Sequence, residues 1–392
     1  MMFECENLKR LGGYVSGEQP SRAKAKLNTN ENPLPPCDAV LRVLASIDGE
    51  MLRRYPDPTA RAFRAEAARL HGLIPDNIIA TNGDDELLRL ALTTFLPLGS
   101  PLGLAEPSYS LYPVLAAVHD SPICAVPLED DWSVPVTIAL RWNAAETKLA
   151  ILVNPHALSG RLTSVEELAA VARAFDGMLL IDEAYVDFVD PGIRHDSIAL
   201  ASDLDNVLLL WTMSKGYSLA GLRLGYGIGS PHLIAPMLSK TKDSYNIDVV
   251  SQKVGEAALR HQAEAAAKWA IVRAERIRMT RELSARGFSC APSQANFLLA
   301  TVTPRNLGRA ERLLRGLAAE GIYIRWFDQE RLRDSLRISI GTAVENDILL
   351  SALDRLLRQD FLGIPATSSE PLPELVNGSG ISHRADARAA WP

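Results

Sequence analysis

The chain has 392 residues, of which 47% are hydrophobic and 22% charged, and its formal net charge is −6 at pH 7. This length suits two domains that share a large core, and the composition is ordinary for a globular protein. The negative charge argues against nucleic acid and anionic membranes as partners, because both attract a broad basic surface, so any bound anion needs a local site.

The four cysteines, Cys5, Cys37, Cys124 and Cys290, lie far apart and form no CxxC pair. This spacing argues against a zinc site and a disulfide framework, and it fits a reducing compartment. The N-terminus has no apolar segment of the signal-peptide type, and no apolar run approaches membrane-spanning length. We therefore expect a soluble, cytoplasmic protein with no bound metal and no membrane partner.

The first part of the chain is predicted to be irregular. Residues 1–36 are polar and end in LNTNENPLPP, whose prolines and asparagines disfavour a helix and predict an extended arm. A short helix is predicted over 37–50, a turn-rich stretch over 53–60 and an amphipathic helix over about 60–70.

From Asn77 onward, apolar strand candidates alternate with helices, which predicts an α/β fold with a mainly parallel sheet flanked by helices. Helix 84–96 carries a buried leucine stripe, and Ser164 with Glu167 forms a capping box at the start of another helix. The strand candidates are 78–81, 101–105, 149–153, 178–181, 207–211 and 224–228.

Polar residues directly follow five of these strands. Ligands of open α/β sheets bind at the carboxyl ends of the strands, so we expect these residues to meet at one rim. They are 82–85, 106–109, 154–156, 182–185 and the loop that begins at 212.

A long polar helix is predicted over about 249–286, ending at Gly287, and it leads to a smaller α+β unit. That unit contains strands at 296–300, 322–326 and 335–340 and helices at 304–320 and 344–358. Residues 362–392 are rich in Pro, Ser, Gly and Ala without periodicity, which predicts a disordered tail.

Lys215 stands just beyond the apolar strand 207–211, where so strongly hydrated a charge is unusual. Partial desolvation would lower its pKa and let the amine attack a carbonyl to form a Schiff base. Thr212, Ser214 and Arg223, on either side of it, could hold a phosphate. The alternative is a solvated lysine in a surface loop.

Asp182 ends another buried strand, where a carboxylate is costly unless it is paired. A protonated ring nitrogen suits it, as in the pyridinium of pyridoxal phosphate, and a helix N-cap is the alternative. Tyr109 could stack on such a ring and Tyr185 could reach its phenolic oxygen, although either could also be core packing.

The helix that begins near Gly83 offers free N–H groups to a phosphate. Asp84 and Asp85 suit a helix start but repel an anion, so we expect their carboxylates to turn outward while the backbone N–H groups point inward.

At this point the chain resembles a known family. SKGYSLAGLRLGY is similar to the lysine loop of the fold-type I pyridoxal-phosphate aminotransferases. Further segments resemble, in order and over about residues 10–358, the histidinol-phosphate aminotransferase group. They are LNTNENP, RYPDPTARAFR, NGDDELLRLAL, EPSYSLYPV, IDEAYVDF, SQANFLL and GIYIRWF with LRISIGTAVEND.

The resemblance implies a large pyridoxal-phosphate-binding domain and a smaller α+β domain in a homodimer that shares its active sites. The predicted division is 1–45 for the arm and part of the small domain, 46–270 for the large domain, 271–361 for the small domain and 362–392 for the tail. The implied reaction is ping-pong amino transfer between histidinol phosphate and 2-oxoglutarate, yielding imidazole acetol phosphate and glutamate. The partners are thus a small amino donor and a 2-oxo acid.

The resemblance also implies roles for individual residues. Lys215 would bind the cofactor covalently and later move a proton, with Asp182 at the pyridine nitrogen and Tyr185 at the phenolic oxygen. The remaining cofactor residues would be Gly83, Asp84, Asp85, Tyr109, Asn154, Thr212, Ser214, Arg223 and, from the other subunit, Tyr55. The substrate residues would be Tyr14, Asn30, Asn296, Arg325 and Arg337.

Arg337 lies inside the otherwise apolar strand SLRISI, where an unpaired guanidinium is expensive. A site that releases a carboxylate or phosphate in each turnover accounts for it, and a permanent ion pair is the alternative. Arg325 could also simply be solvated at a strand end.

One segment departs from the family pattern NPNNPTG, because this chain has NPHALSG at 154–160. Ala157 falls where an asparagine would donate to the phenolic oxygen, and losing such a bond costs about 1.5–3 kcal/mol. Tyr185 or His156 could compensate, or His156 could cap the loop.

Three other functions remain open. They are an aminotransferase for aromatic or other amino acids, a decarboxylase of a phosphorylated amino acid, and a non-catalytic cofactor-binding protein. The last is suggested only by Ala157, and the presence of both Lys215 and Asp182 speaks against it.

Overall fold

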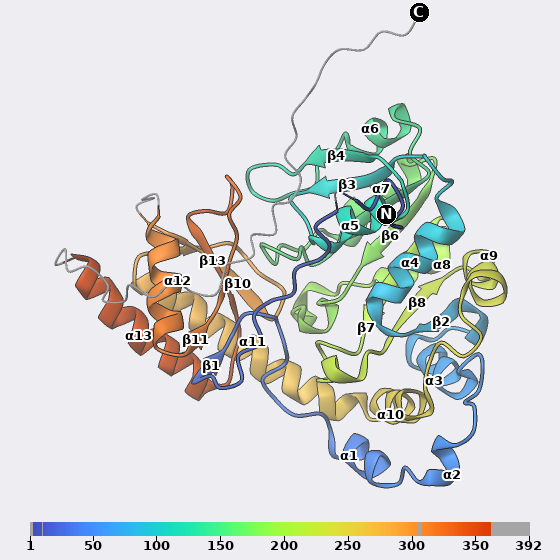
Figure 1. The fold of residues 1–392 in the computed structure, drawn as a ribbon, viewed down its shortest axis with the longest axis horizontal. Coiled ribbons are helices and arrows are strands. Elements are labelled where there is room, and N and C mark those ends of the chain that lie inside the picture. The colour runs from blue at the N-terminus through green and yellow to red at the C-terminus, as the bar shows by residue number, and fades with distance from the viewer. Residues whose placement is uncertain (1–2, 10, 304–307, 362–392) are drawn as a thin grey trace, which may run out of the picture.

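A seven-stranded sheet forms the core of the larger part of the computed structural model, which describes residues 3–9, 11–303 and 308–361 (Figure 1). The strand order is β2-β8-β7-β6-β5-β3-β4. The strands are β2 (Ile78–Thr81), β3 (Leu102–Glu106), β4 (Ile123–Pro127), β5 (Leu149–Val153), β6 (Met178–Asp182), β7 (Val207–Thr212) and β8 (Gly225–Gly229).

Successive residues of the central strands enter different cores, because neighbouring side chains on a strand point to opposite faces. In β7, Val207 and Leu209 join one buried cluster while Leu208 and Leu210 join the other. The continuous apolar run therefore reflects a strand that is covered on both faces.

Helices cover both faces of the sheet. On one face lie α4 (Gly83–Phe95), α5 (Leu111–Val118) and α9 (Pro231–Pro236). On the other lie α3 (Arg61–His71), α6 (Ile138–Ala144), α7 (Val165–Ala174), α8 (Ser197–Asp203) and α10 (Val249–Arg260). The predicted α/β class is confirmed, as is the capping box of Ser164 and Glu167 at α7.

Five strands run in the same direction, β3, β4, β5, β6 and β7, whereas β8 is antiparallel to both of its neighbours. β2, being antiparallel to β8, runs with the parallel set. Strand β4 was not predicted. It is one of the two edge strands, only partly buried and ending in proline, so it lacks the apolar run of the other strands.

A second, four-stranded antiparallel sheet has the order β12-β13-β10-β9. It lies at the other end of the molecule, next to the helices that end the chain's described part (Figure 1). Its elements are α11 (Gln262–Ala285), β9 (Phe288–Cys290), β10 (Phe297–Val302), α12 (Arg309–Ala319), β12 (Arg325–Trp326), β13 (Ser335–Ser339) and α13 (Ala343–Phe361).

Several predicted elements differ in detail. The helix expected over 249–286 is interrupted at His261, which separates α10 from α11. The strand expected over 322–326 is divided into β11 (Ile322–Tyr323) and β12. Residues 304–307 of the expected helix 304–320 lie outside the described residues, as does the predicted tail 362–392.

The N-terminal arm contacts both the large unit and the C-terminal unit, and with the latter it forms a separate two-stranded sheet. Asn7 Nδ2 donates to the carbonyl of Ala117 in α5, and β1 (Ala25–Lys26) pairs in parallel with β11. Beyond the arm, the helix expected over 37–50 is divided into α1 (Asp38–Ala45) and α2 (Gly49–Leu52). The arm therefore brings its own polar residues between the large sheet and the C-terminal unit.

Single 3₁₀ turns occupy Pro75–Asn77, Val186–Phe188, Pro191–Ile193 and Ala220–Leu222, and a π turn occupies Met237–Thr241. The domain boundary predicted at 270/271 falls inside α11, which is continuous across it. The division into domains stays a prediction. Within the described ranges, no helix is both long and apolar enough to cross a membrane.

Candidate active site

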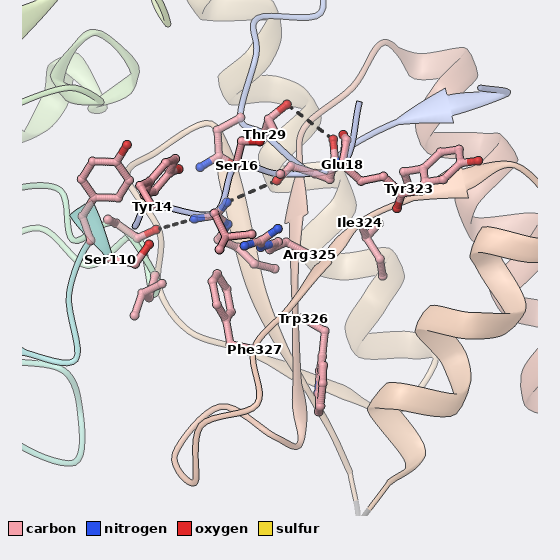
Figure 2. Close-up of a pocket in the computed structure, with 18 of the residues that line it drawn as sticks. Tyr14, Ser16, Glu18, Thr29, Ser110, Tyr323, Ile324, Arg325, Trp326 and Phe327 are labelled. Carbon is pink, nitrogen blue, oxygen red and sulfur yellow. Dashed lines mark hydrogen bonds between the residues drawn. The ribbon is translucent and has the colours of Figure 1, made fainter. Parts of the chain in front are cut away.

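A cavity of ≈ 440 Å³ lies at the carboxyl ends of the large sheet, where the arm and the C-terminal unit close over it. This volume is in the range of small-molecule sites. In Figure 2, Arg325 and Phe327 lie on the side of the C-terminal unit, and Tyr14 and Ser110 lie on the opposite side. Three parts of the chain that are distant in sequence therefore build its wall.

Lys215 lines this cavity just beyond the end of β7. Its Nζ donates a hydrogen bond of 3.1 Å to the backbone carbonyl of Thr29, in the arm. Burial lowers the pKa of Lys215, and the Asp84 carboxylate opposes that shift. No carboxylate of the described residues forms an ion pair with the amine, so its environment increases the neutral, nucleophilic fraction.

The arm also fixes the backbone around this lysine. Asn32 Nδ2 donates to the carbonyls of Lys215 and Gly216, both at 3.1 Å. Trp269 Nε1, from α11, donates to the same Gly216 carbonyl at 2.7 Å. The lysine loop is thus held from both sides by buried donors.

Asp182 lies at the end of β6, next to β7 in the sheet, and lines the same cavity as Lys215. Its Oδ2 accepts a 2.6 Å hydrogen bond from the Tyr112 hydroxyl, and its Oδ1 accepts one of 3.0 Å from Ala184 N. Burial nevertheless raises the pKa of Asp182 to about 7. A carboxylate surrounded only by neutral donors favours a cationic ligand.

The wall includes Tyr14, Tyr109, Tyr185 and Tyr323. Tyr109 contacts Tyr14 edge to face, with ring centroids 5.7 Å apart, and contacts Tyr112 at 5.5 Å. The hydroxyl of Tyr185 accepts a 3.2 Å hydrogen bond from Asn30 Nδ2. Burial raises the pKa of Tyr185, so its hydroxyl keeps a proton that it can donate into the cavity.

The predicted phosphate residues converge near the start of α4. Thr212 is the cross-strand partner of Gly225. A side chain at Gly225 would contact the backbone of Gly83 and Asp84 at 3.0 Å. The Thr212 hydroxyl donates to Ser214 Oγ at 2.9 Å. The N-cap of α4 has no side-chain acceptor, which leaves its N–H groups for an anion.

Gly83 fits this role because a side chain there would force the Arg223 guanidinium to move. Its φ is +77°, and an added Cβ would lie 2.8 Å from Nη2 of Arg223. The guanidinium therefore lies directly over the helix start, as a phosphate clamp requires.

The expectation that the two aspartates turn outward is wrong for Asp84. Its side chain is mostly buried and lies 3.8 Å from Arg223, while Asp85 lies 3.5 Å from the same guanidinium. Burial and the neighbouring Asp84 raise the pKa of Asp85, and the Arg223 guanidinium opposes that shift.

Arg337, in β13, lines the cavity without a carboxylate partner among the described residues. Its Nη1 donates to the carbonyl of Ala157 at 3.1 Å and its Nη2 to that of Asn28 at 3.3 Å, and its buried Nε has no partner. The alternative of a permanent ion pair is therefore wrong. Burial lowers the pKa of this guanidinium.

Arg325, in β12, is directly opposite Arg337 in the antiparallel register. It also lines the cavity, with its guanidinium 5.5 Å from the centre of the Phe327 ring, so it is not a solvated strand end. Two like charges that face each other without a counter-ion form a site for an anion.

Some predicted residues do not reach the cavity. The Asn154 amide bonds to the backbone of Thr163 instead, at 2.7 and 3.2 Å. Tyr55 is 81% exposed and stacks on Tyr245. Asn296 is fully buried and donates to the carbonyl of Asn30 at 2.9 Å, so it supports the arm.

The replacement at Ala157 leaves an apolar spot, because Ala157 packs against Ala184, Tyr185 and Phe297. His156 does not compensate for the missing donor. Both of its ring nitrogens are bonded away from the cavity, to Ser159 and to the carbonyl of Pro107. The loop-capping alternative for His156 is therefore the correct one.

The sequence analysis missed Tyr112, Thr29 and Asn32. Tyr112 could have been found, because it lies three residues after Tyr109 at the start of a helix and so shares its face. Both Thr29 and Asn32 lie in the segment LNTNENP, on which the resemblance partly rests. Thr29 acts through its backbone carbonyl and Asn32 through contacts across the fold, so the sequence did not reveal their roles.

Comparison with known proteins identifies relatives. The family model Aminotransferase class I and II matches residues 22–353. Histidinol-phosphate aminotransferase 1 of Trichormus variabilis is 40% identical over 354 residues, covering 90% of this chain and 98% of that protein. Histidinol-phosphate aminotransferase of Chromohalobacter salexigens is 40% identical, covering 91% and 99%.

Solved structures are similar as well. Histidinol-phosphate aminotransferase from Sinorhizobium meliloti, in complex with pyridoxal-5'-phosphate, superposes with a TM-score of 0.81 at 26% identity. The match covers 86% of this chain and 92% of that one.

Proposed function

Because the chain belongs to the class I and II aminotransferases, we propose that it transfers the amino group of histidinol phosphate to 2-oxoglutarate. The products are imidazole acetol phosphate and glutamate. The observation that carries this proposal is the cavity in which Lys215 and Asp182 meet two arginines that have no carboxylate partner among the residues that the structure describes. Relatives of that name at 40% identity, over nearly their whole length, support the same reaction.

The residues present fit pyridoxal phosphate. Asp182, buried and raised in pKa to about 7, accommodates a protonated pyridine nitrogen, which restores its charge balance. The start of α4 under Arg223, with Thr212 and Ser214 beside it, accommodates the phosphate. Bound there, the cofactor supplies an aldehyde that links covalently to amines and a ring that withdraws electrons from the carbon being deprotonated.

Lys215 performs two tasks in this proposal. Its lowered pKa and its freedom from a carboxylate partner make the amine a nucleophile. The same amine can then accept and return a proton at the cavity wall, with the Thr29 carbonyl orienting its Nζ. Asn32 and Trp269 hold the loop in place while the side chain moves.

The arginines bind the substrates. Both Arg337 and Arg325 face the cavity, and a carboxylate or a phosphate between them relieves their mutual repulsion. One anion site therefore serves glutamate in one half-reaction and the phosphate of the amino donor in the other. Tyr14, beside Tyr109 on the opposite wall, closes the cavity over the substrate.

We further propose a cytoplasmic homodimer whose partner subunit supplies Tyr55 to the cofactor phosphate. The exposed Tyr55 lies outside the cavity of its own chain, which fits a residue that acts on a neighbour. The domain division given above, with 46–270 as the large unit, is kept as part of this proposal.

The experiment is a substrate comparison with purified protein and bound cofactor. Histidinol phosphate, phenylalanine and O-phosphothreonine are each incubated with 2-oxoglutarate, while glutamate and carbon dioxide are measured. We expect glutamate with histidinol phosphate at the highest kcat/KM and no carbon dioxide. Preference for phenylalanine, or carbon dioxide release from O-phosphothreonine, would replace the proposed reaction.

A further inference from the structure

His156 is a buried histidine whose ring joins two loops at the cavity. It is 6% exposed and lies in the turn that follows β5. Its Nε2 lies 2.8 Å from the carbonyl oxygen of Pro107. Its Nδ1 lies 2.9 Å from Ser159 Oγ and 3.2 Å from Ser159 N.

These partners define the protonation of the ring. A carbonyl oxygen only accepts, so Nε2 carries the hydrogen and donates it to Pro107. The backbone N–H of Ser159 only donates, so Nδ1 is the unprotonated acceptor. The ring is therefore neutral, and burial, which lowers the pKa of His156 to about 4, keeps it so.

Each of the two bonds ends next to a cavity residue. Pro107 precedes Tyr109 by two positions, in the loop that follows β3. On the other side, the turn from His156 to Gly160 contains Ala157, whose carbonyl accepts the hydrogen bond from Arg337. A displaced ring would release both Tyr109 and the oxygen that orients Arg337.

We propose that His156 is a positioning residue that fixes Tyr109 through Pro107 and Arg337 through the Ala157 carbonyl. It touches neither substrate nor cofactor. Its two ring nitrogens bond to two different loops, that of Pro107 and that of Ser159, so the two effects are separable by substitution.

A stack of side chains holds the ring in this position. The Trp132 ring lies over His156, with centroids 5.5 Å apart, and the Arg331 guanidinium lies 3.9 Å from the centre of Trp132. Arg331 donates to the carbonyls of Leu128, at 3.0 Å, and Glu129. Trp132, held in place by Arg331, therefore covers one face of the imidazole.

The test uses three variants at position 156. Glutamine can place an amide N–H near Nε2 and keep the bond to Pro107, whereas asparagine can place an oxygen near Nδ1 and keep the bonds from Ser159. Alanine removes both. His119→Ala is the control, because His119 Nε2 makes the same 2.8 Å bond to a backbone carbonyl, that of Leu96, away from the cavity.

Two dissociation constants are measured: that of pyridoxal phosphate for the cofactor-free protein, and that of succinate for the cofactor-saturated protein. We expect His156→Ala to weaken both about tenfold, the scale of losing one or two supporting hydrogen bonds. We expect His156→Asn to weaken mainly cofactor binding and His156→Gln mainly succinate binding. His119→Ala should leave both constants within about twofold, because it removes a bond of the same kind at a place away from the cavity.

The proposal is overturned if His156→Ala retains both constants, or if the Asn and Gln variants weaken both ligands in parallel. It is equally overturned if His119→Ala reproduces the losses. Should the alanine variant not fold, the contrast between Asn and Gln decides. Both readouts are binding constants of pyridoxal phosphate and succinate. The test therefore stays valid even if the amino donor is not histidinol phosphate.

Discussion

The hydroxyl of Tyr112 donates a 2.6 Å hydrogen bond to Oδ2 of Asp182 at the end of β6. This bond and the one from Ala184 N favour the carboxylate, yet burial outweighs them and the pKa of Asp182 rises to about 7. The cofactor-free protein therefore keeps a site for positive charge at a cost to its own stability.

The first prediction concerns that cost. The pKa of Asp182 is about 7 in the folded state, against the ordinary value of 3.8 expected in the unfolded chain. The native state therefore binds the proton more tightly. Protonated Asp182 therefore contributes to the free energy of unfolding. This contribution is fully present below about pH 4 and is lost as the pH rises through about 7. Over this range it amounts to at most roughly 4 kcal/mol.

Urea unfolding of the cofactor-free protein at several pH values measures it. The unfolding free energy of Asp182→Asn should fall less between pH 5 and 8 than that of the unsubstituted protein. Asp187, whose pKa burial also raises to about 7, is present in both proteins and cancels. Parallel curves for the two proteins would show that Asp182 is not the group responsible.

The second prediction tests the phosphate site. Gly83→Ala places a Cβ 2.8 Å from Arg223 Nη2, so the guanidinium must move from the helix start. We expect the dissociation constant of pyridoxal phosphate to rise about tenfold or more, as when a charged hydrogen bond is lost. Gly99→Ala is the matched control, because its φ is +78° but nothing lies within 4 Å. Equal effects of the two substitutions would reduce the result to backbone strain.

The third prediction separates the arginines. Arg337→Ala should raise the KM for both substrates about a hundredfold and Arg325→Ala about tenfold, because Arg337 is the better oriented donor. Neither should lower the melting temperature of the cofactor-bound protein, since each removes a repelling charge that has no counter-ion. A clear drop in melting temperature would instead indicate a structural role.

The fourth prediction concerns the dimer. Tyr55→Ala and Lys215→Ala should each be nearly inactive alone. When the two variants are unfolded, mixed and refolded together, hybrid dimers should regain up to about a quarter of the activity, because one site in each hybrid has both residues. Activity no greater than the sum of the separate proteins would mean that Tyr55 does not act across subunits.

Much of the fold was predictable because strands buried on both faces leave long apolar runs, as in β5, β6 and β7. The edge strand β4 leaves no such run and was missed. Once the strands were recognised, the rim was predictable as well, because residues that follow parallel strands meet at one edge of the sheet.

Side-chain direction was less accessible to sequence analysis. Asn154 follows β5 just as Asp182 follows β6, yet its amide turns to Thr163. Arg325 could not be placed until its register opposite Arg337 was known. Contacts across the fold decide such directions, whereas a buried strand is marked in the sequence by its own apolar run.

The most direct test of the account is to reduce the cofactor-bound protein with borohydride and map the modified peptide by mass spectrometry. The account predicts one pyridoxyl group per chain, located on Lys215, and none in Lys215→Ala. A modification on another lysine, or none at all, would contradict it.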